Sequence, residues 1–143
     1  MKLTIQDFAE VVGALRGPCT DGGAQEKRRA VRMVVTAKLE ATVLRGDELS
    51  RKFSTLTRDV SLTGVGLFQS VALQQNQEIV LNLPRASGKP LFVCAIVMHC
   101  RPLADGVFGV GCEFTRQAPV DMQKMLLRND NEQERRIRES VLN

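Results

Sequence analysis

The sequence predicts a mainly β domain, an antiparallel barrel or sandwich with one helix before it and one after it. About six short segments rich in apolar and β-branched residues lie between residues 31 and 114. Turn-forming residues separate these segments, and no helical periodicity interrupts them. The chain has 143 residues, 43% of them hydrophobic, which suits one domain with its own core. We expect a helix and linker in residues 1–26, the β domain in 27–118 and a helical tail in 119–143.

The first expected element is a helix over residues 4–15. Thr4 can cap its N-terminus, with Asp7 three residues later as in a capping box. Apolar residues recur at helical spacing at Ile5, Phe8, Val12 and Leu15. Gly17-Pro18 ends the helix, and the small, polar residues 19–26 are typical of a flexible linker.

The expected strands follow the linker. They are Val31–Leu44, Ser50–Arg58 and the short apolar runs 65–68, 78–84, 91–100 and 107–114. Turn-forming residues lie between them at 45–47, 61–64, 86–88 and 104–106. A second helix is expected to begin at Pro119, with Met122, Met125 and Leu126 on one face. Asn129-Asp130-Asn131 can interrupt this helix, so its continuity is left open.

The net charge of the chain is concentrated in one short segment. Of the formal charge of +4, four positive charges come from Lys27, Arg28, Arg29 and Arg32, and the remaining charges balance. This concentration indicates an anion-binding segment rather than a broad basic face for DNA. No apolar run is long enough to span a membrane, and Asp7 and Glu10 interrupt any secretory signal, so we expect a cytoplasmic protein without membrane insertion.

Catalytic and metal-binding patterns are absent from the sequence. The four cysteines (Cys19, Cys94, Cys100 and Cys112) form no CxxC or CxxH pair, so we expect no metal site. Three of them lie in apolar runs and are expected to be small core residues. His99 is the only histidine, and the sequence has neither nucleophile-elbow glycines nor a P-loop, so its pattern indicates neither a nucleophilic triad nor an NTPase site. We expect His99 in the core or at the barrel edge. The sequence therefore predicts a protein that is not an enzyme.

The first candidate site segment is Lys27-Arg28-Arg29-Ala30-Val31-Arg32. Its outer two arginines are four residues apart and would project to the same side of an extended segment. Guanidinium groups bind phosphate, the guanine edge and the purine face. A solvated basic turn is the alternative interpretation.

The second candidate segment is Asp59-Val60-Ser61-Leu62-Thr63-Gly64, at the end of an expected strand. The carboxylate and the hydroxyl, two residues apart, can point in one direction, and a carboxylate accepts the N–H donors of guanine. Gly64 is expected to allow a turn with a positive φ. The alternative is an Asx-turn that only joins two strands.

Together the two segments resemble the PilZ domain family. The resemblance consists of RxxxR at 28–32, DxSxxG at 59–64, and an all-β body that ends on GVGCEF and a helix. It covers residues 27–118 and matches every defining position of both motifs. It implies a six-stranded antiparallel β-barrel that binds the bacterial second messenger cyclic di-GMP and needs no cofactor.

The resemblance assigns ligand contacts to seven residues, Lys27, Arg28, Arg29, Arg32, Asp59, Ser61 and Gly64. The arginines would contact phosphate and guanine, the carboxylate and hydroxyl would hydrogen-bond the base, and the glycine would shape the turn. The basic residue at 27 is the type that accommodates a stacked pair of ligand molecules. Lysine stacks less well than arginine, so one molecule or a stacked pair remains open.

We expect the segment 27–32 to close over the nucleotide and to change how the N-terminal helix sits against the barrel. The output then passes through a separate partner protein, and the charged tail also allows a homo-oligomer. One alternative is an interaction adaptor with the same barrel that works without nucleotide. Another is a nucleic-acid-binding barrel, which the absence of Trp and Tyr disfavours because such barrels stack bases on aromatic side chains.

Overall fold

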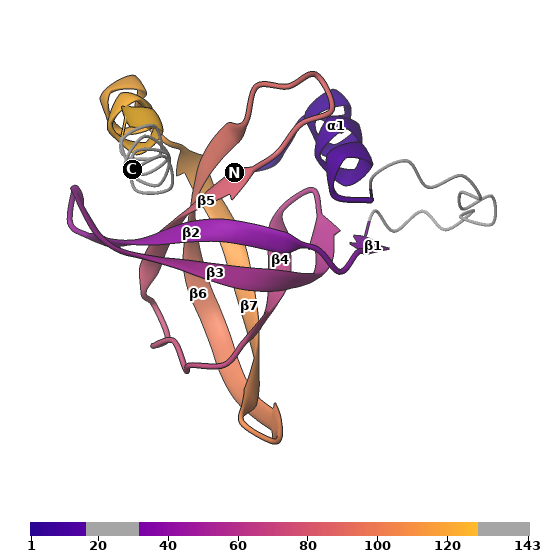
Figure 1. Ribbon diagram of the computed structural model, residues 1–143, viewed down its shortest axis with the longest axis vertical. Helices are drawn as coiled ribbons and strands as arrows, with labels where there is room; N and C mark the ends of the chain where they lie inside the picture. Colours follow the sequence, from indigo (N-terminus) through magenta and orange to yellow (C-terminus); the bar gives the residue numbers. More distant parts are fainter. Residues whose placement is uncertain (17–31, 129–143) are drawn as a thin grey trace, which may run out of the picture.

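The computed structural model describes residues 1–16 and 32–128, except for the side chain of Arg32. Within this part of the chain it has one complete helix and seven strands (Figure 1). The elements are α1 Ile5–Arg16, β1 Arg32–Val34, β2 Lys38–Arg45, β3 Glu48–Ser61, β4 Gly64–Gln69, β5 Glu78–Leu83, β6 Leu91–Ala104 and β7 Val107–Gln117. Residues 120–128 form the described part of a second helix. None of the helices described is long and apolar enough to cross a membrane.

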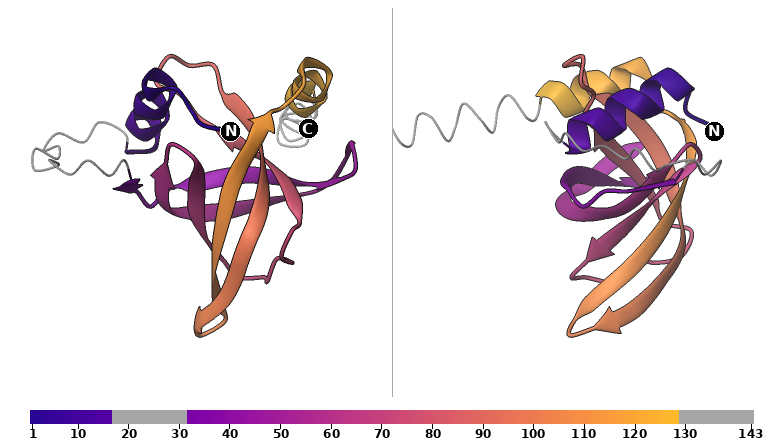
Figure 2. Two further views of the ribbon diagram at one scale, coloured as in Figure 1. Left: turned by 180° about the vertical axis from the view of Figure 1, so that it is seen from behind. Right: turned by 90° about the vertical axis from the view of Figure 1, so that its right-hand side faces the viewer.

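The strands form a closed antiparallel barrel. They pair in the order β1-β3-β2-β5-β6-β7-β4, and an additional pairing of β4 with β3 closes the ring. Six strands therefore make the barrel, while β1 is added along β3. This confirms the six-stranded barrel with one helix before it and one helix after it in the chain. Figures 1 and 2 show α1 and the residues 120–128 at one end of the barrel and the β6–β7 hairpin at the other.

The segment 31–44, predicted as one strand, is divided into β1 and β2. Both run along the same edge of β3, where β1 pairs with residues 59–61 and β2 with residues 48–56. Thr57 is fully buried at the break between them. Its hydroxyl accepts a hydrogen bond from the Ala37 amide at 2.9 Å and donates one to the Val35 carbonyl. This hydroxyl bonds to backbone groups that do not pair with β3 between the two strands. The strand can therefore be interrupted here without leaving a buried backbone group unpaired.

The other strands lie where they are predicted, and all are longer except β5, which ends one residue earlier than predicted, at Leu83. The predicted strand Ser50–Arg58 begins at Glu48 and continues to Ser61, β6 runs to Ala104 and β7 runs to Gln117. The predicted turns at 45–47, 86–88 and 104–106 contain residues in the left-handed region, for example Gly46 at a φ of 67° and Gly106 at 79°. Glycine adopts such values without the steric cost that a Cβ imposes.

The barrel interior and α1 share one apolar core. The largest fully buried side chains in it include Phe114, Leu67, Ile79 and Leu81 from the strands and Val11 from α1. The helix lies over one end of the barrel and excludes water from it. One predicted position in its apolar stripe is wrong: Ile5 is 77% exposed, because it lies in the first turn beyond the barrel end.

A smaller cluster holds the second helix against the outer side of the barrel. Met122 and Leu126 are buried there against Val80 and Phe92. The predicted face is therefore right for these two positions and wrong for Met125, which is 49% exposed. Whether residues 129–131 interrupt this helix lies outside the described residues.

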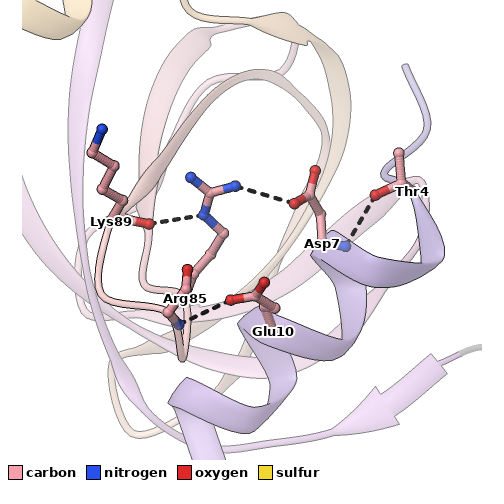
Figure 3. Close-up of polar contacts among 6 residues, drawn as sticks. Thr4, Asp7, Glu10, Arg85 and Lys89 are labelled. Carbon is pink, nitrogen blue, oxygen red and sulfur yellow. Dashed lines mark hydrogen bonds and ion pairs between the residues drawn. The ribbon is translucent and has the colours of Figure 1, made fainter.

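Polar contacts fix α1 to the loop between β5 and β6 (Figure 3). The predicted cap is present, since the amide of Asp7 donates to the Thr4 hydroxyl at 3.0 Å. The Asp7 carboxylate accepts a hydrogen bond from the Arg85 guanidinium at 3.1 Å, and the Glu10 carboxylate accepts one from the Ser87 amide at 2.9 Å. The helix is thus attached through its first two turns to a loop whose strands belong to the barrel.

Candidate functional site

A cleft of about 280 Å³ lies on the outer barrel surface, where β3, β4, β7 and β6 run side by side. Small-molecule sites enclose roughly 300–1,000 Å³, so the cleft is near the lower end of this range. It is lined by Arg58, Asp59, Ser61, Thr63, Gly64, Val65, Gly66, Met98, His99, Gly111, Cys112 and Glu113. Every defining residue of the predicted motif DxSxxG therefore lies in one cleft.

A β-bulge in β3 turns two consecutive side chains onto the cleft. The pairing with β4 shifts between Thr57 and Asp59, which leaves Arg58 as the extra residue. The Arg58 Nε lies 3.6 Å from a carboxylate oxygen of Asp59. Gly66, opposite Asp59 on β4, leaves room for both side chains. A Cβ at this position would lie 2.5 Å from the Asp59 carboxylate and 2.6 Å from the Arg58 guanidinium. The bulge, the ion pair and the glycine together set the direction of the carboxylate.

The turn from β3 to β4 is held by Ser61. Its Oγ accepts hydrogen bonds from the amides of Gly64 at 3.1 Å and Thr63 at 3.3 Å. The hydroxyl thus has a local structural role besides the ligand contact that the sequence predicts. The alternative interpretation of the motif is an Asx-turn; the turn observed is instead made by a serine hydroxyl, and it lies beside a cleft.

The positive φ predicted for Gly64 is wrong. Its φ is not among the positive values of the described glycines. A Cβ at this position would instead overlap the Cys112 carbonyl oxygen and lie 3.3 Å from the carbonyl carbon. Gly64 is needed because β4 and β7 approach each other closely where the turn enters the sheet, a requirement that only the tertiary structure reveals.

Strand β1 brings the backbone of Arg32, the last arginine of the first motif, beside the second motif. In its antiparallel pairing with β3, Arg32 lies opposite Ser61 and Val34 lies opposite Asp59. The last arginine of the motif is therefore a direct cross-strand neighbour of the second motif at the level of the backbone. The side chain of Arg32, and the residues Lys27, Arg28 and Arg29, lie outside the described part of the chain.

Sequence reasoning missed Arg58, Met98, His99 and Glu113 as cleft residues. Arg58 directly precedes the motif DxSxxG and could have been found from that position. His99 is exposed and not a core residue. Its position depends on a shift in the β6–β7 pairing between Val97 and His99, and no local pattern reports such a shift.

The thiols near the cleft are structural. Cys94 and Cys112 are buried, as predicted, and Cys100 is half-buried against the core, whereas Cys19 lies outside the described residues. Burial raises the pKa of the Cys112 thiol to about 12, and burial also raises that of Cys94. No cluster of His, Cys, Asp and Glu able to hold a metal ion occurs in residues 1–16 and 32–128.

The Cys112 pKa predicts a loss of stability in alkali. The unfolded thiol ionises near its ordinary value of 9.0, whereas the folded thiol holds its proton to about 12, so the folded state loses stability as the pH rises between these values. At pH 10.5 this group should cost about 2 kcal/mol relative to pH 8. Urea unfolding at both pH values should show a larger loss for the native chain than for Cys112→Ala. Equal losses would contradict a buried, protonated thiol.

Comparison with known protein families decides the classification. The model of the PilZ domain matches residues 26–141. The chain belongs to the PilZ domain family. The match includes both motifs and all the strands, whereas α1 lies before it. A comparison with curated proteins found no match.

Three solved structures resemble the chain at low sequence identity. The first is the inhibitor of motility MotI (DgrA) of Bacillus subtilis, with 16% sequence identity and a TM-score of 0.45. The second is MrkH of K. pneumonia in complex with c-di-GMP, with 15% identity and a TM-score of 0.47. The third is the PilZ domain of YcgR from Escherichia coli with c-di-GMP, with 20% identity and a TM-score of 0.45. The matches cover 77%, 78% and 81% of this chain. The chain spans about half the length of the first two, 52% and 55%, and 98% of the YcgR domain.

Proposed function

We propose that this PilZ protein is a cyclic di-GMP receptor without catalytic activity. The observation that carries the proposal is the register of β1 on β3, which sets Arg32 opposite Ser61 and beside the cleft that holds Asp59. Arg32 and the second motif, some thirty residues apart in sequence, are thereby cross-strand neighbours. The segment that ends at Arg32 is rich in phosphate-binding guanidinium groups, and the second motif offers a carboxylate acceptor for guanine.

The proposed division of roles follows from the chemistry of the ligand. The Asp59 carboxylate accepts the N1 and N2 protons of one guanine, and the Ser61 hydroxyl adds a contact while it holds the turn. Arg28 and Arg32 bind phosphate and the Hoogsteen edge or face of the base, with Arg29 and Lys27 adding positive charge. Each charge-assisted hydrogen bond contributes about 1.5–3 kcal/mol, so a few of them offset the ordering of six to eight residues.

Isothermal titration calorimetry with cyclic di-GMP tests this function. We expect saturable heat at micromolar concentrations, and the stoichiometry separates one bound molecule from a stacked pair. Arg28→Ala should abolish the heat while the melting temperature without ligand stays unchanged. An absence of heat with the intact chain would overturn the proposal and favour the nucleotide-independent adaptor.

We further propose that binding alters how α1 sits on the barrel and that a partner protein reads this change. The Leu3 amide, just before α1, donates a hydrogen bond to the carbonyl of Leu62 inside the motif at 2.8 Å, and both side chains are buried in the same core. After α1, the chain returns through residues 17–31 to β1, which pairs with the same motif. Leu3 before α1 and strand β1 after it thus both contact the segment 59–64.

Hydrogen–deuterium exchange measures this coupling. A ligand that favours one position of α1 changes the opening equilibrium of the helix by its differential affinity for the two arrangements. We expect the exchange rate of the peptide 5–16 to change at least about threefold at saturating cyclic di-GMP. Unchanged exchange in this peptide, with protection at the cleft, would contradict the coupling while leaving the receptor function intact.

A further inference from the structure

A second β-bulge faces the first one across the cleft. In β6, the pairing with β7 shifts between Val97 and His99, which leaves Met98 as the extra residue. Val97 is fully buried, whereas Met98 is 45% exposed and His99 is also exposed. As with Arg58 and Asp59 on β3, the bulge therefore turns two consecutive side chains outward. Bulges commonly re-aim side chains next to binding sites, and here one bulge lies on each side of the cleft.

The two bulges flank a pair of glycines. The cross-strand partners form one row over four strands, in which Asp59 lies opposite Gly66, Gly66 opposite Gly111, and Gly111 opposite His99. At a strand spacing of about 4.8 Å, the two ends of this row are no more than about 14 Å apart. The row is a floor without side chains, bounded by a carboxylate at one end and an imidazole at the other.

The imidazole of His99 extends over this floor. A Cβ on Gly111 would overlap its Nε2 and lie 2.6 Å from Cε1 and 3.0 Å from Cδ2, so the far edge of the ring occupies the space above the glycine. At the opposite end, the Asp59 carboxylate occupies the corresponding space above Gly66. Both polar groups therefore lean inward over the floor from opposite sides. Among residues 1–16 and 32–128, no hydrogen bond or ion pair joins the imidazole to another group.

We infer that His99 is a ligand-binding residue of this site and contacts the nucleotide from the side opposite Asp59. The inference rests on the proposed function and adds a residue that neither motif contains. An imidazole hydrogen-bonds to purine nitrogen, carbonyl or phosphate oxygen, all of which a cyclic guanine dinucleotide carries. The ligand then lies between Asp59 on β3, which selects the guanine base, and His99 on β6, which contacts the opposite side of the nucleotide.

Proton NMR of the untagged chain tests the contact directly. His99 is the only histidine, so its two carbon-bound ring protons are identified without mutagenesis. On titration with cyclic di-GMP we expect both resonances to shift and a nuclear Overhauser effect to join a ring proton to a ligand proton. Saturable binding without either change would overturn the inference.

Calorimetry on variants separates a ligand contact from a structural role. His99→Ala and His99→Phe should each weaken cyclic di-GMP binding about five- to tenfold, whereas His99→Gln, which keeps a hydrogen-bonding group, should lose less. Gly111→Ala should displace the ring and weaken binding similarly, with the double variant His99→Ala/Gly111→Ala no weaker than either single one. Leu103→Ala, an exposed change on the same strand outside the cleft, should stay within twofold.

The outcomes distinguish this inference from the proposed function. If the native chain binds, Asp59→Ala does not, and His99→Ala retains native affinity, the inference is overturned and the receptor function stands. If the native chain does not bind cyclic di-GMP, both are overturned. Thermal melts of each variant show whether the barrel is intact.

Discussion

Replacing Asp59 by alanine is expected to weaken cyclic di-GMP binding at least a hundredfold and to leave the barrel as stable as before. The variant loses two charge-assisted hydrogen bonds to guanine, each worth about 1.5–3 kcal/mol. One of its partners in the protein is the Arg58 guanidinium, whose side chain is 36% exposed and can turn to water. An ion pair of this kind contributes about 0.2–1 kcal/mol, so its loss should change the melting temperature little.

Asp47→Ala is the matched control for this prediction. It removes the same charge from an exposed position in the turn between β2 and β3, away from the cleft. Calorimetry should give native affinity for Asp47→Ala and no measurable binding for Asp59→Ala. Similar affinities for the two variants would show that net charge, and not the position of this carboxylate, matters for binding.

Gly64→Ala is expected to be the most damaging single-methyl change in the motif. The added Cβ meets the backbone of β7, with the Cys112 carbonyl in overlap and the Glu113 Cα at 3.4 Å, and a backbone cannot rotate away. The strand β4 must then move from β7, which typically costs about 1–3 kcal/mol. The same movement breaks the hydrogen bond from the Gly64 amide to Ser61, so cyclic di-GMP affinity should fall as well.

Urea denaturation measures this effect, with Gly13→Ala as its control. In the middle of α1, a new Cβ at position 13 meets only the Ala86 Cβ at 3.9 Å, an ordinary contact. That substitution should stabilise the chain by roughly 0.5–1 kcal/mol, because alanine loses less entropy in a helix than glycine. A Gly64→Ala variant as stable as the native chain would contradict the close approach of β4 to β7.

Local chemistry made much of the fold predictable. The capping contact of Thr4 with Asp7 depends on residues three apart, and the turn at Gly46 depends on the freedom of a single residue. The existence of the strands follows from their apolar composition. The site motif was also accessible, because Asp59 and Ser61 are two residues apart on one strand and face the same way.

What the sequence did not reveal depends on partners distant in the chain. The break between β1 and β2 arises where the Thr57 hydroxyl, some twenty residues later, replaces ladder contacts. The role of Gly64 is set by Cys112 on another strand. The exposure of His99 results from a bulge in the β6–β7 register. Each is a property of cross-strand pairing, which composition and periodicity do not encode.

A crystal structure of the chain with bound cyclic di-GMP tests the central claim most directly, because it shows whether both motifs reach the same nucleotide. The account predicts one guanine over the cleft, with the Asp59 carboxylate within hydrogen-bond distance of N1 and N2 and a guanidinium of Arg28 or Arg32 on the same nucleotide. A nucleotide bound elsewhere on the barrel, or one that touches Asp59 with both arginines turned away from it, would contradict the account.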